Sequence, residues 1–554
     1  MGLEASSRLD HVVIADEQKT EVRVRCVVVL SKRKAMMRIK PTDLCREALT
    51  LANELNSGRD GNLNHESSLK SHWNLGAVIV LRSFSLYVSR MAENQIEIYG
   101  VDSLPDSVRT SRPRDIVTML LGGNLSLAVM VFGWLAILYG LDWWGAVTSI
   151  VVGTAVGAAL VAGTSLLGYR SATNNSVTSG AFFGVQGRLV ASAIGLLICL
   201  QYCALTIWTG GDAIAAGVSR ITETETSTAG TVIAYGVIAL AIVTIAVYGF
   251  RWLLVLNRWL PIAMAIAMAV VVATWMSLFD PSYPGVPEEL ALGDYNATWL
   301  LSAITAGAAG PISYVTLTGD WSRYISPEKH SPRAVVGFTF VGLFLGNVIP
   351  CLFGAFVSVV AFDVDSFAAG LVTGAPANLL IPIVVLGLLG SLGQGGLNLY
   401  SMGLDLDAIL PRLTRPQSTF FVAAMSVLLV FLGRFVFDLE AAVTNVALFL
   451  TSLASAWAAI ALLGYVRHRG HFDSNDLQVF NRRERGGRYW FWNGWNLRAT
   501  LAWAAGSIAG ILGISTVDYV GPIAERLSYV DVSVPSSMLV AGLLYLILDR
   551  PHGR

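Results

Sequence analysis

Charged residues are scarce in this chain, and so are the sequence patterns that most enzymes carry. Only 14% of the 554 residues are Asp, Glu, Lys or Arg, and acidic and basic residues balance at 38 each. A net charge of zero provides no general attraction for nucleic acid. No Gly-x-x-x-x-Gly-Lys segment is present, which argues against a phosphate-binding loop for ATP-driven transport. Without a catalytic pattern in the sequence, we predict that the protein is not an enzyme and has no catalytic residues.

Metal-binding and disulfide patterns are also missing from the sequence. The five cysteines are scattered, and the closest two, Cys199 and Cys203, lie four residues apart on one face of an apolar run. All seven histidines fall outside the long apolar runs. We therefore expect packing thiols, no metal site and no cofactor. The first 25 residues contain no apolar core, so we do not expect a cleavable signal peptide.

Long apolar runs are what the sequence has in abundance. Hydrophobic residues make up 54% of the chain, and the mean hydropathy is +0.59. This composition predicts an all-α polytopic membrane protein, because no soluble domain of this size needs it. We predict twelve transmembrane helices from runs of sufficient length. The runs are 116–140, 143–168, 188–213, 229–250, 253–279, 297–319, 334–361, 378–402, 417–437, 441–466, 495–516 and 533–549.

Basic residues are distributed unequally between the loops that join these runs. The even-numbered loops with the span ends beside them and the C-terminus carry eighteen Lys or Arg residues, whereas the odd-numbered loops with their span ends carry three. The odd-numbered loops are acidic instead, with residues such as Glu223, Asp280 and Asp363. Because cytoplasmic loops are enriched in Lys and Arg, both termini are predicted to be cytoplasmic. We expect a multi-pass protein of the plasma membrane, and the alternation supports the count of twelve.

Residues 1–95 differ in composition from the rest of the chain. They contain a basic cluster at 32–40 and a polar stretch at 53–71, and the apolar segment at 75–81 is ended by Arg82. No segment here is long enough to span a bilayer. We predict a poorly ordered cytoplasmic extension before a transporter domain at 96–554, and we hypothesise that the natural chain starts at Met91.

Two of the predicted spans, 116–140 and 297–319, are interrupted by residues that disfavour helices. The interruptions are Gly122, Gly123, Asn124 and Ser126 in the first, and Gly307, Gly310 and Pro311 in the second. In a bilayer, freed backbone groups persist only where they face protein or a watery cavity. Interruptions five spans apart predict two inverted five-helix repeats, 116–279 and 297–466, with a binding site between the broken helices. The alternative is a seam of small residues for close helix packing.

The C-terminal part is predicted to follow the repeats as a basic cytoplasmic loop at 467–494 and two further helices at 495–549.

Amide and aromatic side chains collect in the third and eighth spans. Tyr202 and Thr206 share one helical face, as do Gln394 and Asn398. A flat heteroaromatic ligand would satisfy buried amides and stack on the ring. The alternative is that these groups bond one helix to another.

Five short motifs occur in a fixed order. They are IEIYGVD at 96–102 with RPRD at 112–115, NLS at 124–126 with GLDWW at 140–144, FGVQG at 183–187, TGDWSRY at 318–324 and NLYS at 398–401. Together they resemble nucleobase:cation symporter family one, in its purine–cytosine permease branch, over about 450 residues. The resemblance implies a LeuT-type fold of five plus five helices with two additional ones. It also implies import of cytosine or a purine by symport with a proton or sodium ion.

Residue roles in the family can be carried over to this chain. The stacking aromatic of the third span falls at Tyr202, and the stacking aromatic of the sixth span falls near Pro311, with Tyr314 the nearest ring. The substrate site implied in this way consists of Asn124, Tyr202, Thr206, Ser313, Tyr314, Gln394 and Asn398.

A cation site is implied more weakly, at Gly123, Ser126 and Gly393. Sodium-dependent relatives use backbone carbonyls of the first span and two hydroxyls of the eighth span. Those hydroxyls fall at Leu392 and Gly393 and are both missing, which favours a proton over sodium as the coupling ion. Alternatives are symport of another heterocycle (allantoin, a hydantoin or a pyrimidine vitamin precursor) and a non-transporting membrane sensor or scaffold. We expect a nucleobase and the lipid bilayer as partners, with no nucleic acid and no obligate protein.

Overall fold

The computed structural model describes residues 9–15, 24–30, 100–224, 226–248, 250–361, 367–410, 413, 415–436 and 439–548. Residues 1–94 and 95–554 form two separate units. In the first unit, the strands β1 (Leu9–Ala15) and β2 (Val24–Leu30) pair antiparallel, with Leu9 opposite Leu30. This pair of strands was not predicted from the sequence, although β2 is rich in valine, which favours strands. The rest of the predicted extension, including Met91, lies outside the described residues.

The second unit consists of helices. Its first half contains η1 (Asp106–Val108), α3 (Pro113–Asn124), α4 (Leu127–Leu138), α5 (Trp143–Ala162), α6 (Ser165–Ser171), α7 (Asn175–Thr178), α8 (Gly180–Phe183), α9 (Leu189–Thr222), α10 (Thr228–Tyr248) and α11 (Phe250–Trp275). Its second half contains η2 (Pro287–Glu289), α12 (Tyr295–Ser302), the π-helix η3 (Ala303–Ala308), α13 (Ala309–Ile312), α14 (Thr318–Ser322), α15 (Pro332–Val360), α16 (Phe367–Thr373), η4 (Ala377–Leu379), α17 (Leu380–Ile409), α18 (Arg415–Val436) and α19 (Leu439–Arg467). The C-terminal elements are α20 (Ser474–Leu477), α21 (Leu497–Leu512), α22 (Pro522–Arg526) and α23 (Ser533–Leu548).

The helices of the described segments identify a multi-pass membrane protein. Seven are long and apolar enough to cross a membrane, and α3 and α4, bent by 67° at their junction, together make an eighth. Three shorter apolar helices, at Phe420–Leu432, Leu497–Leu512 and Ser533–Leu548, overlap predicted spans. The predicted span 297–319 is divided among α12, η3, α13 and α14. The helical fold is thus confirmed, whereas the count of twelve spans stays a prediction.

Polar residues begin several helices at the predicted loop positions. The Asp142 side chain accepts a hydrogen bond of 3.2 Å from the Gly145 amide at the start of α5. Ser331 accepts one from the Ala334 amide at the start of α15, where Pro332 follows it. Such caps satisfy amide groups that have no partner within the helix, and proline tolerates the first helical position. These caps explain why predicted and observed helix starts differ by only a few residues.

The two halves of the bundle have corresponding neighbours. The broken helix α3–α4 packs against α15, and the broken segment η3–α13 packs against α5, which occupies the matching position in the other half. Likewise α9 contacts α10 and α18, whereas α17 contacts α18 and α10. Exchanged contacts of this kind are what two structural repeats of five helices produce. The extensive contact between α9 and α17 joins the repeats.

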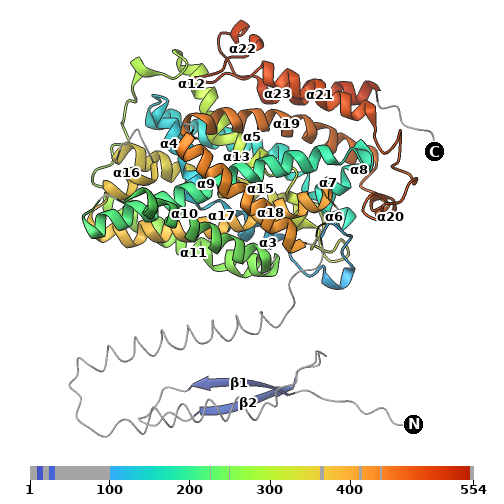
Figure 1. The fold of residues 1–554 in the computed structure, drawn as a ribbon, viewed down its shortest axis with the longest axis horizontal. Helices are drawn as coiled ribbons and strands as arrows, with labels where there is room; N and C mark the ends of the chain where they lie inside the picture. Colours follow the sequence, from blue (N-terminus) through green and yellow to red (C-terminus); the bar gives the residue numbers. More distant parts are fainter. Residues whose placement is uncertain are drawn as a thin grey trace. The chain divides into compact units, whose positions relative to one another are not determined.

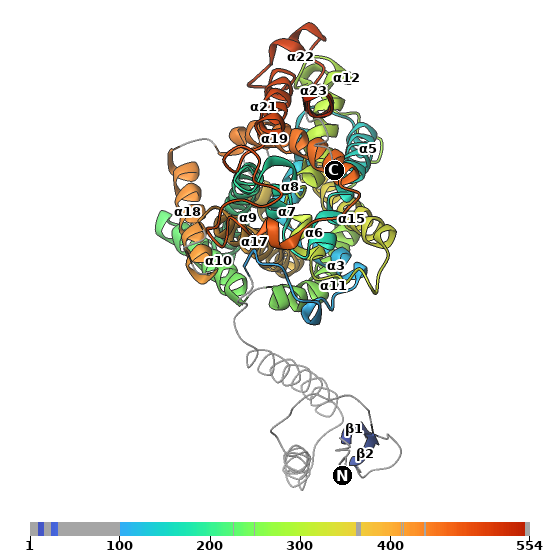
Figure 2. The ribbon, with the colours of Figure 1, turned by 90° about the vertical axis from the view of Figure 1, so that its right-hand side faces the viewer.

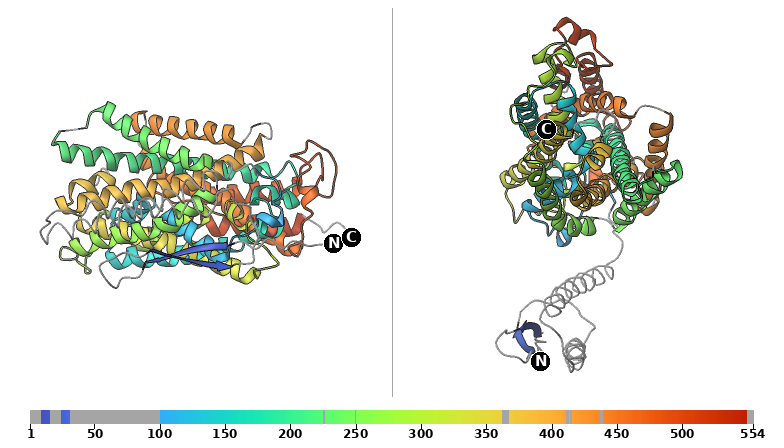
Figure 3. Two further views of the ribbon diagram at one scale, coloured as in Figure 1. Left: turned by 90° about the horizontal axis from the view of Figure 1, so that it is seen from below. Right: turned by 90° about the vertical axis from the view of Figure 1, so that its left-hand side faces the viewer.

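The C-terminal helices lie outside this arrangement. In Figure 1, α21 and α23 run side by side along α19 at one edge of the helical unit. Their close approach depends on small residues, because a Cβ atom at Gly506 would lie 2.5 Å from the Cβ atom of Ala541. In Figure 2, α18 and α10 lie together at the periphery, and Figure 3 shows the same helices from two further sides. The polar residues described next are therefore surrounded by helices.

Candidate functional site

The first broken span is interrupted at Leu125 and Ser126. α3 ends at Asn124, and the extended backbone of Ser126 turns the chain into α4. The Ser126 Oγ accepts a hydrogen bond of 3.4 Å from the Val129 amide, and so caps α4. The prediction of a break is correct, but the break follows the glycine pair and does not include it.

The glycine pair has a packing role inside α3. A Cβ atom at Gly122 would overlap Oδ1 of Asn257 in α11, and one at Gly123 would overlap the Leu397 side chain in α17. The seam of small residues that the sequence analysis gave as an alternative is therefore the correct interpretation of Gly122 and Gly123. The broken-helix interpretation is correct for the two residues that follow Asn124.

The second broken span is irregular over a longer stretch than its glycine and proline positions predicted. The π-helix η3 comes first, Pro311 lies within α13, and the chain then turns through residues 313–317 before α14 begins. The Asn347 side chain in α15 supports η3, donating from Nδ2 to the carbonyls of Ala306 at 2.9 Å and Gly307 at 3.2 Å. A side-chain amide thus satisfies carbonyls at the irregular backbone, as a membrane interior requires. Asn347 was not among the predicted site residues, although an amide within an apolar run indicates a functional or structural role.

Several predicted site residues meet between the two breaks. The Tyr314 hydroxyl donates to Oδ1 of Asn124 at 2.6 Å, and the Ser126 hydroxyl donates to Oε1 of Gln394. The Tyr202 and Ser313 side chains also interact. All of these residues are buried. The two broken spans, α9 and α17 therefore converge on one polar layer inside the bundle.

Aromatic rings border this polar layer. Phe132 of α4 lies beside Tyr202, with ring centroids 6.1 Å apart and planes tilted by 46°. Tyr314 lies beside Trp321, with centroids 5.7 Å apart. Phe132 and Trp321 were not among the predicted site residues, because helical spacing indicates a face but not which rings meet across helices. The bordering rings provide the flat apolar surfaces on which a heteroaromatic ligand stacks.

Thr206 and Asn398 differ in how their polar atoms are satisfied. The Thr206 hydroxyl donates to the Tyr202 carbonyl one turn earlier in α9, at 2.6 Å. The Asn398 side chain is 4% exposed, and its Nδ2 group has no hydrogen-bond partner within the described residues. An unsatisfied buried amide costs about 1–3 kcal/mol. Asn398 is therefore the predicted site residue whose chemistry most clearly calls for a ligand.

At the predicted cation site, α17 is packed closely against the end of the first broken helix. A Cβ atom at Gly393 would overlap the Gly122 carbonyl oxygen, and one at Gly390 would lie 2.7 Å from the Leu125 carbonyl oxygen. The backbone of α17 thus covers the end of α3 directly. The Ser126 hydroxyl is already bonded to Gln394. Within the described residues no group of three His, Cys, Asp or Glu side chains is arranged to hold a metal ion. The cation site stays a prediction.

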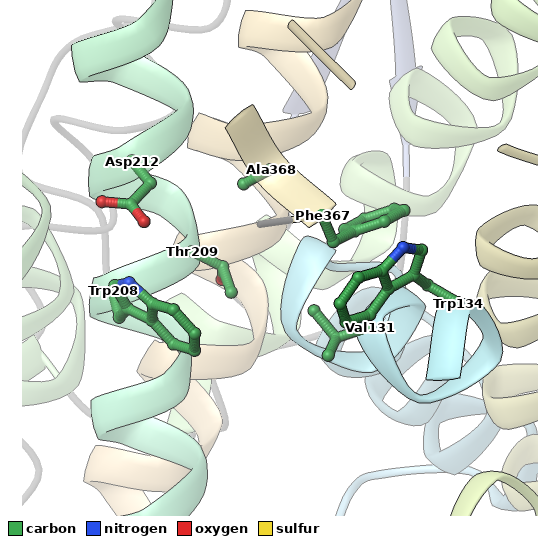
Figure 4. A pocket seen from close by; sticks show the side chains of 7 residues that line it. All are labelled: Val131, Trp134, Trp208, Thr209, Asp212, Phe367 and Ala368. Carbon is green, nitrogen blue, oxygen red and sulfur yellow. The ribbon is translucent and has the colours of Figure 1, made fainter. Parts of the chain in front are cut away.

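A small cavity lies among α4, α9 and α16, beside Thr206 and toward the C-terminal end of α9. Figure 4 shows Trp134 and Trp208 on opposite sides of it, with Phe367 next to Trp134. Its lining residues are Val131, Trp134, Trp208, Thr209, Asp212, Phe367 and Ala368. Its volume of about 10 Å³ is close to the space one water molecule needs. A nucleobase does not fit this cavity unless the surrounding helices move.

Sequence comparison relates the chain to known permeases. A family model described as permease for cytosine/purines, uracil, thiamine, allantoin matches residues 103–534. YxlA of Bacillus subtilis (strain 168), named as a candidate purine-cytosine permease, is 23% identical over 474 residues, covering 83% of this chain and 97% of YxlA. The purine-cytosine permease fcyB of Emericella nidulans is 23% identical over 484 residues, covering 83% of this chain and 89% of fcyB.

Structure comparison identifies the same kind of fold. Mhp1, a nucleobase-cation-symport-1 family transporter solved in a closed conformation with bromovinylhydantoin bound, matches with a TM-score of 0.62 and 17% identity. The match covers 81% of this chain and 94% of Mhp1. The inward-facing conformation of Mhp1 matches with a TM-score of 0.58. At this identity the similarity establishes the fold alone. The ligand of this chain has to be inferred from the residues of its own site.

Proposed function

The chain belongs to the family of permeases for cytosine/purines, uracil, thiamine and allantoin, and from this membership we propose that it imports a nucleobase by cation symport. The substrate is cytosine or a purine, and the coupling ion is a proton rather than sodium. The protein works in the plasma membrane with both termini in the cytoplasm. It operates by alternating access, in which one part of the bundle moves against another around a central site.

The unsatisfied Asn398 amide, one helical turn from Gln394, is the observation that carries this proposal. A nucleobase presents ring nitrogens and exocyclic groups that pair with side-chain amides, and its flat faces stack on aromatic rings. Asn398 and Gln394 lie on one face of α17, Gln394 bonds to Ser126 at the first break, and α17 packs against α9, the helix of Tyr202. The layer contains the chemical groups that a heterocycle of this kind needs.

The choice of a proton follows from the packing at Gly393. A sodium ion needs several oxygen ligands around one point. Here α17 offers glycine where a hydroxyl would be needed, and its backbone is pressed against the Gly122 carbonyl. A proton requires only one titratable group and no coordination shell. Whichever ion is used, it drives uptake only by binding one conformation better than the other.

A second candidate is import of a different heterocycle, such as allantoin, a hydantoin or a pyrimidine vitamin precursor. Two observations favour keeping it: Mhp1 was solved with a hydantoin, and the family description includes allantoin and thiamine. A sensor or scaffold that keeps the fold without transporting is the alternative from another class. Substrate choice within the proposed site depends on single hydrogen-bond partners.

Uptake measurements distinguish these candidate functions. Cells that carry the chain receive labelled cytosine, adenine, allantoin or a pyrimidine precursor, with and without sodium and with and without a proton uncoupler. We expect accumulation of cytosine or adenine that the uncoupler abolishes and sodium does not affect. Accumulation of only another heterocycle would shift the proposal to the second candidate. If no heterocycle accumulates, the transporter proposal is wrong.

A further inference from the structure

A buried carboxylic acid near the C-terminal end of α17 has an oxygen that no hydrogen bond satisfies. Asp405 is 2% exposed, and its Oδ1 accepts a hydrogen bond of 2.7 Å from the Ser176 hydroxyl of α7. Its Oδ2 has no hydrogen-bond partner in the part of the chain that the structure describes, and the same is true of the buried Thr316 Oγ1. A Cβ atom at Gly195 of α9 would overlap Asp405 Oδ2 and lie 3.0 Å from Thr316 Oγ1. Both unsatisfied oxygens therefore point to one place beside α9.

A second buried carboxyl group lies nearby. Asp320 of α14 is 2% exposed, and it is close enough to Asp405 for the two to repel each other when both are ionised. Among the described residues, Asp320 is the charged group that acts on Asp405, and Asp405, Asp320 and Cys203 act on Cys199. Two like charges in a buried site strongly disfavour double ionisation. Asp405 is the member of the pair whose carboxyl group is held by a defined donor, the Ser176 hydroxyl.

Protonation would remove the cost of a charge on Asp405. An ionised carboxylate only accepts hydrogen bonds, and no group in the described structure donates to Oδ2. With a proton on Oδ2, Asp405 is neutral, and Oδ1 still accepts from the Ser176 hydroxyl. The buried site then holds a neutral acid that α7 keeps in place.

This cluster is connected to the proposed substrate layer. Cys199 lies near both Asp405 and Asp320, and it also lies near Tyr314. Tyr314 in turn bonds to Asn124 between the two broken spans. The acid therefore lies one layer away from the substrate site, on the side of α7, which the distribution of basic residues predicts to be cytoplasmic.

We propose that Asp405 holds the proton that is transported together with the substrate. The inference rests on the proposed function and names the site of its coupling ion. The proton reaches Oδ2 through the substrate layer while that layer faces outward, and it stays on the neutral acid in the closed bundle. When the cytoplasmic side opens, water takes the proton from Oδ2 and leaves a carboxylate. The empty bundle then returns to the outward-facing state with Asp405 ionised, and Asp405 takes the next proton from outside.

Proteoliposomes containing the full chain test this site. Asp405→Asn keeps the shape and mimics the neutral acid, so we expect exchange of labelled for unlabelled nucleobase to stay within about twofold of wild type. Accumulation driven by a pH gradient should fall at least tenfold, and substrate-linked proton flux, read with an entrapped pH dye, should disappear. Asp518→Asn is the control, since Asp518 undergoes the same chemical change outside the site, in the loop after α21, where its carboxylate accepts a 2.9 Å bond from Asn445. The control should keep both activities.

Substrate-linked proton flux of wild-type size in Asp405→Asn would overturn the proposal, as would accumulation by the wild-type protein that depends on sodium alone. If Asp405→Asn does not fold, Ser176→Ala takes its place. It removes the hydroxyl that donates to Oδ1 and favours the ionised acid, so the pH of half-maximal uptake should rise by about one unit. An unchanged pH profile of Ser176→Ala would contradict the proposal.

A readout that does not depend on transport separates the two proposals. Infrared titration of the protein in membranes should show a protonated carboxyl band at neutral pH that is missing in Asp405→Asn and present in Asp518→Asn. If wild type exchanges no heterocycle but shows this band, the proposed function is wrong while the neutral acid is real. If wild type transports but the band is unaffected by Asp405→Asn, the assignment of the proton to Asp405 is wrong.

Discussion

The Tyr314 hydroxyl donates a 2.6 Å hydrogen bond to Oδ1 of Asn124, 190 positions earlier in the chain, and so joins the two broken spans. Asn124 is the last residue of α3, and Tyr314 lies in the turn between α13 and α14. Both side chains are buried, at 4% and 5% exposure. A movement of one broken span must therefore either carry the other with it or break this bond.

Replacing Tyr314 with phenylalanine removes that connection and retains the ring. Oδ1 of Asn124 then loses its partner in a buried site, which costs about 1–3 kcal/mol. We expect the initial rate of nucleobase uptake to fall about tenfold, with a lower midpoint of thermal unfolding. Tyr139→Phe is the control, because its hydroxyl makes a 3.1 Å bond with Thr444 at the far end of α4. A Tyr314→Phe variant with wild-type uptake and stability would show that the two broken spans do not depend on this bond.

The positions of the helices could largely be predicted because a bilayer imposes long apolar runs. α9, α10, α15 and α17 each overlap a predicted span, and α9 and α17 continue to Thr222 and Ile409, beyond the predicted ends at 213 and 402. The breaks were predicted at the residues with the poorest helix propensity, but propensity alone does not decide where a helix ends. Gly122 remains helical because Asn257 needs the space of its missing side chain, and that contact joins residues 135 positions apart.

From the sequence, the site could be predicted only to the extent of which residues share one face of a helix. Spacing placed Tyr202 and Asn398 correctly on their own helices, and the resemblance to the symporter family brought the helices together. It did not indicate that Phe132 would border Tyr202 or that Gln394 would accept from Ser126. Such pairs depend on the rotation of two helices about their axes, and a sequence of one chain does not specify that rotation. Which of these residues contact substrate stays a prediction.

Asn398→Ala distinguishes a ligand contact from a structural one. The Nδ2 group has no partner among the described residues, so its loss should leave thermal stability unchanged or slightly higher. Nucleobase affinity should fall at least tenfold, because the ligand loses a hydrogen-bond partner in a dry site. Affinity can be measured by ligand-induced thermal shift and stability in the absence of ligand. Ser401→Ala, in the same helix and also buried with an unsatisfied hydroxyl, should change neither. A fall in stability without a fall in affinity would make Asn398 structural.

Gly393→Ala tests whether α17 must lie directly on the end of α3. The new Cβ atom would overlap the Gly122 carbonyl, which is backbone and cannot rotate away. We expect strain of about 1–3 kcal/mol, a lower unfolding temperature and loss of uptake. Gly236→Ala is matched in chemistry, but nothing lies within 4 Å of its Cβ position, so it should be neutral or stabilising. Tolerance of alanine at Gly393 would indicate that this contact opens easily and leaves room for an ion.

Asn347→Leu tests whether the π-helix of the second broken span depends on one side chain. Asn347 donates to the carbonyls of Ala306 and Gly307 and to the Thr154 hydroxyl, at 2.9, 3.2 and 2.9 Å. Leucine has the same branched shape, with bulkier ends, but donates nothing, so these buried acceptors lose their partner at a cost of about 2–4 kcal/mol in total. We expect a marked fall in unfolding temperature and slower uptake, because η3 would tend toward a regular helix and rotate the residues that follow it, including Ser313 and Tyr314. Ser358→Ala, in the same helix α15, removes a buried hydroxyl that has no partner in the described structure and should have little effect. Equal stability and uptake in Asn347→Leu and Ser358→Ala would mean that packing alone maintains η3.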